Sequence, residues 1–269
     1  MNGQPDPDEG AFGLSDFVAE GMLLLGAGSA VMYQLARREV GLGVVEHSST
    51  LDRPLDRLRT TLTYVYAMAL GTTDERRAVA AMVDRRHGPV RSPGRYSAFD
   101  PELQLWVAAT LAHTGETLQE RVFGRMDPDT RERVYRDSWV LGTALQVTQE
   151  MWPPTRADFE DYWQASLAKL APDPAVQAYA RRLLSTGAAP LVARPLQPVQ
   201  SLVTRGNLDA RTRGVLALSW SRRDQVRYDR FWRGFPPTYR AIPRGVRQLP
   251  AGLVLADLRR RRRAGGRVI

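Results

Sequence analysis

Cysteine is absent from this chain of 269 residues. Without a thiol the protein can form no disulfide, no iron–sulfur cluster and no zinc site built on cysteine. The same absence excludes a covalently attached c-type haem and a haem iron bound by a thiolate. The composition also fits a reducing compartment, and we expect a cytoplasmic protein.

Lysine is almost absent as well. Lys169 is the only one among 38 basic residues, so the net charge of +9 comes almost wholly from arginine. The densest group is the run of five arginines at 259–263, which has no aromatic residue among them. We therefore predict a solvated basic tail at 259–269 and no specific nucleic-acid site, with polyanion binding kept as an alternative.

Long hydrophobic runs are also lacking. The most apolar stretch, residues 21–32, is shorter than the roughly 20 residues that cross a bilayer. We expect no transmembrane segment, while peripheral contact with a membrane stays open. Residues 1–13 are polar and lack the basic and apolar regions of a signal peptide, so we expect a disordered segment and no export.

Strand patterns are poor, whereas signals for helix starts are frequent. Apolar residues recur at intervals of three and four, which is typical of amphipathic helices. We expect a first helix from Ser15 to about Val40, broken at Gly26 and Gly28, and a second from Pro54 to Gly71. Further helices should begin at capping residues, namely Thr72, Asp100, Asp127, Thr155 and Asp173. These patterns predict an all-α protein with a single large helical domain at 14–258.

Three histidines, His47, His87 and His113, limit the metal chemistry available. None belongs to an HExxH motif or to another local spacing of metal ligands. A serine hydrolase is poorly supported because no GxSxG motif is present, and no GxGxxG or P-loop motif points to a nucleotide.

The predicted helix from Pro54 carries two adjacent stripes. Its core face is predicted to consist of five apolar residues: Leu55, Leu58, Leu62, Val65 and Ala69. Beside them lies a line of mixed character: Arg57, Thr61, Tyr64 and Met68. This second line suits the wall of a pocket with a polar edge. Alternatively, Arg57 extends to the surface and Thr61 donates to its own helix.

The next predicted helix places His87 on its apolar face, four residues after Val83 and eight after Val79. By spacing alone, His87 is one of three things: a core residue whose ring nitrogens are hydrogen-bonded, a positive charge that stabilises the C-terminal end of its helix, or a metal ligand. His113 shares a face with Trp106 and Thr110 and leaves the same alternatives.

An ordered set of motifs resembles the MpaB and rubber-oxygenase (latex-clearing protein) family over roughly residues 14–260. The matching segments, in chain order, are residues 24–28, 41–48, 54–61, 71–90, 96–103, 106–111, 141–142, 152–155 and 162–170. The resemblance implies a partly globin-like helical fold that holds non-covalent haem b. It also implies that His87 ligates the iron, with Arg57 and Thr61 beside the haem as catalytic residues and Tyr64 in the same wall. Arg57 would pair with a propionate or polarise bound oxygen, and Thr61 would donate a hydrogen bond to that oxygen.

By this resemblance the protein is a haem-dependent oxygenase that uses dioxygen and acts on a small apolar metabolite, isoprenoid or aromatic. The chain departs from the family pattern at Thr60, where some members have a lysine, and at Ala108, where many have a histidine. Arg91 and Ser92 also replace the usual residues after Val90. The resemblance therefore does not predict the substrate of this protein. A haem-binding sensor or carrier without turnover, and a helical protein that binds polyanions, are the alternatives.

Overall fold

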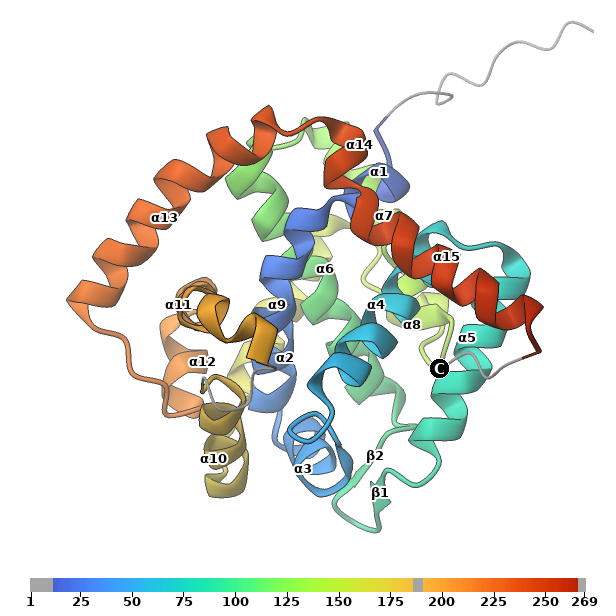
Figure 1. Cartoon of the computed structure of the whole chain (residues 1–269). Coiled ribbons are helices and arrows are strands. Elements are labelled where there is room, and N and C mark those ends of the chain that lie inside the picture. Colours follow the sequence, from blue (N-terminus) through green and yellow to red (C-terminus); the bar gives the residue numbers. More distant parts are fainter. Residues whose placement is uncertain (1–11, 186–190, 266–269) are drawn as a thin grey trace, which may run out of the picture.

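The computed structural model describes residues 12–185 and 191–265, with the side chains of 191–193 left out, and this part of the chain is almost entirely helical (Figure 1). The N-terminal half contains these elements: α1 (Leu14–Ala19), η1 (Gly21–Gly26), α2 (Ala27–Ala36), α3 (Arg38–His47), α4 (Pro54–Leu70), α5 (Thr73–His87), β1 (Arg91–Ser92), β2 (Tyr96–Ser97) and α6 (Pro101–Phe123).

The C-terminal half contributes further helices: α7 (Pro128–Asp137), α8 (Val140–Thr143), η2 (Gln149–Met151), α9 (Arg156–Ala168), α10 (Pro174–Leu183), η4 (Leu191–Leu196), α11 (Gln197–Asn207), α12 (Ala210–Val215), α13 (Arg222–Ala241), α14 (Arg244–Arg247) and α15 (Leu249–Arg263). The predicted all-α class is confirmed. A two-stranded antiparallel hairpin of β1 and β2, which the sequence did not predict, interrupts the helices.

Capping residues start the helices where the sequence predicted. The backbone N–H of Glu75 donates to Thr72 Oγ1 at 3.2 Å, and the Glu75 carboxylate accepts from the Thr72 N–H at 2.9 Å. Four other predicted caps accept backbone hydrogen bonds in the same way, namely Asp100, Asp127, Thr155 and Asp173. Each side chain satisfies N–H groups that have no partner within the helix.

The helical segment predicted from Ser15 to about Val40, with breaks at Gly26 and Gly28, is correct in its break at Gly26 and wrong in its start, in its end and at Gly28, which lies within α2. Gly13 is the N-cap of α1. Extended residues at Glu20 and Arg37, together with the change from 3₁₀ to α-helix after Gly26, divide the segment into four pieces. Glu20 is buried and accepts from the Tyr239 hydroxyl at 2.8 Å, and this long-range contact outweighs helix continuity. Gly26 lies at the junction of η1 and α2, where a Cβ atom would come within 2.6 Å of Leu118 on α6.

Helix α6 runs through the centre of the molecule, where it packs against η1, α2, α8 and α13 (Figure 1). Thirteen of its residues are buried, and they include Trp106, whose indole N–H donates to the Tyr33 carbonyl at 3.2 Å. The other helices surround this buried axis. Within the described ranges no helix has both the length and the apolar character needed to cross a bilayer.

The predicted core face of α4 is wrong in its first turn, because Leu55 is 56% and Leu58 is 43% exposed. The buried side of α4 consists of Thr60, Thr63, Tyr66, Ala67 and Met68. Neighbours pack on several sides of this helix: α1, α5, α8 and α15. Thr60 tolerates burial because its hydroxyl donates to the Asp56 carbonyl at 2.8 Å.

The basic tail predicted to start at residue 259 needs correction. Helix α15 continues through Arg263, so a boundary after residue 258 cuts a helix. Arg259 donates to the buried Glu75 carboxylate at 2.8 Å and joins α15 to α5. The arginine run is thus partly structural. Of the segments predicted to be disordered or tail, residues 1–11 and 266–269 lie outside the described residues.

Candidate functional site

A cavity of about 360 Å³ lies among α3, α4, α5, α6, α8 and the hairpin. This volume falls in the range of about 300–1,000 Å³ that small-molecule sites occupy. Apolar side chains form much of its wall, among them Val40, Val44, Val83, Val107 and Leu111. The cavity therefore suits a largely apolar ligand with a few polar groups.

All four residues predicted for the site line this one cavity: Arg57, Thr61, Tyr64 and His87. The first three follow one another along α4, and His87 is the last residue of α5, which packs beside α4. Met68, the fourth member of the predicted line, is fully buried and contributes to the core. Three residues of the predicted line thus share one cavity wall, and of the predicted core face Leu62, Val65 and Ala69 pack against the core whereas Leu55 and Leu58 do not.

The His87 ring is half-buried and its Nδ1 atom has no hydrogen-bond partner among the described residues. Its ring meets Phe99 edge to face, with centroids 6.4 Å apart. Burial lowers the pKa of His87 below its ordinary value, the Asp84 carboxylate opposes this shift, and the charge of Arg57 adds to it. A neutral imidazole, the form that binds a metal, is therefore favoured at neutral pH.

Two arginines reach the same cavity, Arg57 from α4 and Arg86 from α5. Neither forms an ion pair with a carboxylate in the part of the chain that the structure describes. Burial lowers the pKa of the Arg57 guanidinium, and the nearby charge of Arg86 lowers it further. Arg57 is half-buried and Arg86 is exposed, and neither has a carboxylate partner among the described residues, so both can pair with negative groups of a ligand. Sequence reasoning missed Arg86, for which no spacing signal was noted.

The hydroxyls of Thr61 and Tyr64 already donate within the protein. Thr61 Oγ1 donates to the Arg57 carbonyl at 3.0 Å, and the Tyr64 hydroxyl donates to the Leu141 carbonyl at 2.8 Å. Burial raises the pKa of Tyr64, which keeps its phenol neutral. Both hydroxyl oxygens can still accept hydrogen bonds. To donate to a ligand, the Thr61 hydroxyl must first break its hydrogen bond to the Arg57 carbonyl.

His47 and Tyr96 also line the cavity. His47 Nε2 lies 3.1 Å from the Tyr96 hydroxyl, which donates to the Glu46 carboxylate. Arg95 donates to the other oxygen of Glu46 at 2.9 Å. The cavity thus contains a second histidine, which unlike His87 has hydrogen-bond partners within the protein.

His113 does not line the cavity. It stacks on Trp163 with ring centroids 3.8 Å apart and an interplanar angle of 14°. Burial lowers its pKa to about 4. His113 is thus a half-buried residue that packs against Trp163, away from the cavity. Ala108, at the position where many family members have a histidine, is buried and also lies outside the cavity wall.

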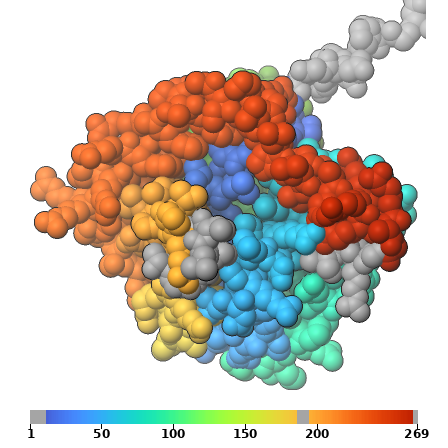
Figure 2. Space-filling model, in the orientation of Figure 1, coloured from blue at the N-terminus to red at the C-terminus, as the bar shows by residue number. Residues whose placement is uncertain are grey.

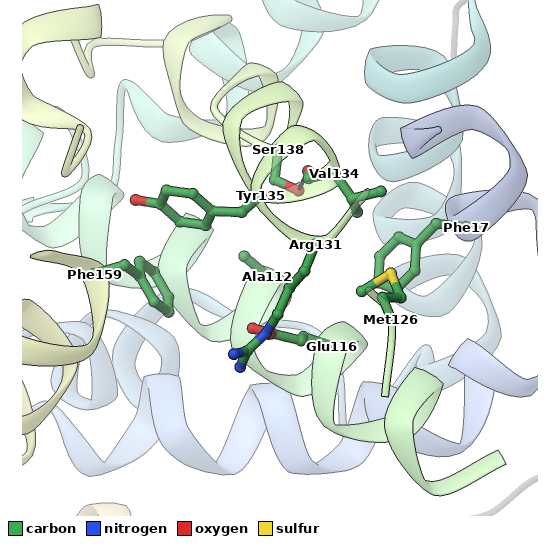
Figure 3. A pocket seen from close by; sticks show the side chains of 9 residues that line it. All are labelled: Phe17, Ala112, Glu116, Met126, Arg131, Val134, Tyr135, Ser138 and Phe159. Atoms are coloured by element: carbon green, nitrogen blue, oxygen red, sulfur yellow. Dashed lines mark hydrogen bonds and ion pairs between the residues drawn. The ribbon is translucent and has the colours of Figure 1, made fainter. Parts of the chain in front are cut away.

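A second cavity, between α1, α6, α7 and α9, is far smaller (Figure 3). Its volume of about 10 Å³ holds about one water molecule. Glu116 bridges Arg131 and Arg156 beside it, and apolar groups such as Phe17 and Phe159 form the rest of the wall. An internally paired ion cluster of this size stabilises the packing of these helices and offers no room for a substrate.

No three His, Cys, Asp or Glu side chains within residues 12–185 and 191–265 converge to hold a metal ion. A haem iron takes four of its ligands from the porphyrin, so one histidine suffices to attach it. The arrangement of His87 with Arg57 and Arg86 fits a haem, since haem b has two carboxylates and an apolar ring. The fold and site define a helical protein with a largely apolar cavity of small-molecule size.

Comparison with known proteins identifies the family. The model of the ER-bound oxygenase mpaB/B′/rubber oxygenase catalytic domain matches residues 15–240. "Uncharacterized protein Mb2261" of Mycobacterium bovis and "Uncharacterized protein Rv2237" of Mycobacterium tuberculosis are each 36% identical over 256 residues, which span 92% of this chain and 100% of theirs. No solved structure matches the chain. The chain belongs to the mpaB/rubber oxygenase family.

Proposed function

We propose that this protein is a haem b-dependent oxygenase that uses dioxygen and acts on a small apolar substrate, isoprenoid or aromatic. The observation that carries the proposal is the meeting of a neutral histidine, His87, with Arg57 and Arg86 in one largely apolar cavity. Family membership supports oxygenase chemistry. When bound, haem b supplies an iron that activates dioxygen.

In this proposal His87 holds the iron through an imidazole nitrogen. The ring is suited to this role because burial favours its neutral form. A hydrogen-bond network supports the end of α5: Gln146 donates to Asp84 at 3.1 Å, and the Gln146 N–H donates to Gln104 at 2.9 Å. Asp84 lies three residues before His87, so these contacts keep the helix end in place.

Arg57 and Arg86 bind the two carboxylates of the haem through charge-assisted hydrogen bonds. Tyr64 ties α4 to α8 through the Leu141 carbonyl and fixes one side of the cavity. Thr61 presents its oxygen to the cavity as an acceptor. The valines and leucines of the wall exclude water from the ring and from an apolar substrate.

Absorption spectroscopy of protein expressed with ample haem tests the ligand assignment. We expect a Soret band that is lost or shifted in His87→Ala and kept in His113→Ala, because His113 lies outside the cavity. His47→Ala should also keep the band, which separates the two cavity histidines. A normal haem spectrum in His87→Ala would overturn the assignment.

A haem-binding sensor or carrier without turnover is the second candidate, since it requires the same site. Oxygen consumption on addition of apolar alkenes distinguishes the two functions: an oxygenase consumes oxygen, whereas a carrier does not. A purified protein without colour after haem supply would leave the third candidate, a helical protein that binds polyanions.

A further inference from the structure

An apolar stripe is exposed along the C-terminal helices. Val246, Leu249 and Leu253 are 52%, 53% and 68% exposed. Gln248 joins α14 to α15 in helical conformation, so these residues, spaced by three and four, share one face. Exposed apolar side chains of this size on one helix face indicate a surface that contacts another apolar environment.

The opposite face of α15 is already covered. Ala251, Leu255 and Leu258 are buried in the core, and the helix packs against α4 and α1. The first half of α15 is therefore apolar on two sides, and only one side contacts the protein. A surface helix normally presents polar residues on its outer side. The exposed stripe is thus unexplained by the fold.

Positive charge gathers around the stripe. Residues 240–263 contain eight arginines and one acidic residue, Asp257, although the net charge of the whole chain is only +9. Ion pairs occupy five of these arginines: Arg244 with Asp16, Arg247 with Glu20, Arg259 with Glu75, and Arg260 and Arg261 with Asp257, which Arg59 also contacts. Arg240, Arg262 and Arg263 have no carboxylate partner among the described residues. Exposed arginines at 262 and 263 end the helix. The segment is complementary to an anionic surface.

An anionic lipid bilayer combines the two features, because a layer of phosphates lies directly over hydrocarbon. Nucleic acid offers negative charge but no apolar layer beneath it. An acidic protein surface also offers negative charge, but no hydrocarbon that apolar side chains can enter. Helix α4, which packs against α15, carries two further exposed apolar side chains, Leu55 and Leu58. Figure 2 shows α15, in red, at the molecular surface beside the blue α4 region.

We propose that α14 and α15 bind the surface of an anionic lipid bilayer. Leu249 and Leu253 enter the boundary between headgroups and acyl chains. Arg260, which lies seven residues after Leu253 on the same face and is 77% exposed, contacts lipid phosphates together with Arg263 at the helix end. The helix lies along the surface. This inference does not depend on haem or on catalysis, since none of these residues lines the ligand cavity.

Co-sedimentation of the full chain with vesicles tests the proposal. We expect binding to phosphatidylcholine vesicles that contain phosphatidylglycerol, and little binding to phosphatidylcholine alone. The double variant Leu249→Ser/Leu253→Ser should bind at least about tenfold more weakly, because both side chains lose their transfer to hydrocarbon. Val226→Ser is the matched control, since Val226 on α13 is 49% exposed and lies outside the stripe. Salt should weaken the binding.

Absence of cysteine allows a second measurement. A polarity-sensitive dye on Leu253→Cys should shift to shorter wavelength when vesicles are added, whereas the same dye on Val226→Cys should not. Unchanged thermal unfolding of the serine variants shows that they fold. No vesicle binding, equal binding of the double variant, or a dimer in solution that the double variant dissociates would each overturn the proposal.

Discussion

At the scale of single residues, the cavity is distinguished by Arg57 and Arg86, which have no carboxylate partner among the described residues. We expect Arg57→Ala and Arg86→Ala each to weaken haem binding by about 10- to 100-fold, the effect of removing one hydrogen bond to a charged group, about 1.5–3 kcal/mol. Arg85→Ala is the matched control, because Arg85 is exposed at the end of α5, as Arg86 is, but does not line the cavity.

Haem transfer to an acceptor protein measures this loss. A rate of haem loss from Arg86→Ala equal to that from Arg85→Ala would remove Arg86 from the site. The Soret position should stay unchanged in both variants, because neither side chain ligates the iron.

His113 makes stability depend on pH. Its pKa is about 4 in the folded protein and about 6.5 when unfolded. The unfolded chain therefore binds a proton more readily between these values, and folding becomes less favourable as the pH falls from about 6.5 to 4. This histidine alone accounts for a loss of about 3 kcal/mol across that window.

Urea unfolding at several pH values measures the effect. His113→Phe keeps an aromatic ring against Trp163 but cannot be protonated, so its stability should fall less steeply over the same window. Parallel pH profiles of the variant and the original chain would show that His113 is protonated in the folded state.

Capping decides where helix α5 begins, at the scale of the element. Thr72→Ala removes the hydroxyl that accepts from the Glu75 N–H and should cost about 1 kcal/mol of unfolding free energy. Thr73→Ala is the matched control, because Thr73 is exposed and belongs to the helix itself. Urea unfolding distinguishes the two. Equal losses would mean that the capping box adds no stability.

The end of α15 joins distant parts of the molecule. A chain ending at Leu258 loses the Arg259–Glu75 ion pair and leaves a buried carboxylate without its cation. We expect a loss of about 1–3 kcal/mol. A chain ending at Gly265 keeps this pair and serves as control. Thermal unfolding gives the comparison, and a truncation at 258 as stable as the control would restore the picture of a separate tail.

Sequence alone determined the helical class, five helix starts and the polar line on α4. These features depend on neighbours within one or two turns: a cap residue satisfies N–H groups of its own helix, and residues spaced by three and four share a face. Arg57, Thr61 and Tyr64 could be placed on one line for this reason.

Only the tertiary structure decided which side of α4 is buried, since that depends on helices far away in the sequence. Leu55 and Leu58 are exposed, while Thr60 and Thr63 are buried in a helix on which α1, α5, α8 and α15 pack. The same holds for Arg86, whose position in the cavity wall follows from the packing of α5 on α4. The spacing of residues along the sequence likewise cannot show that Glu20 accepts a hydrogen bond from Tyr239 or that Glu75 forms an ion pair with Arg259. Such contacts join segments about 180 or more residues apart, and folding alone brings them together.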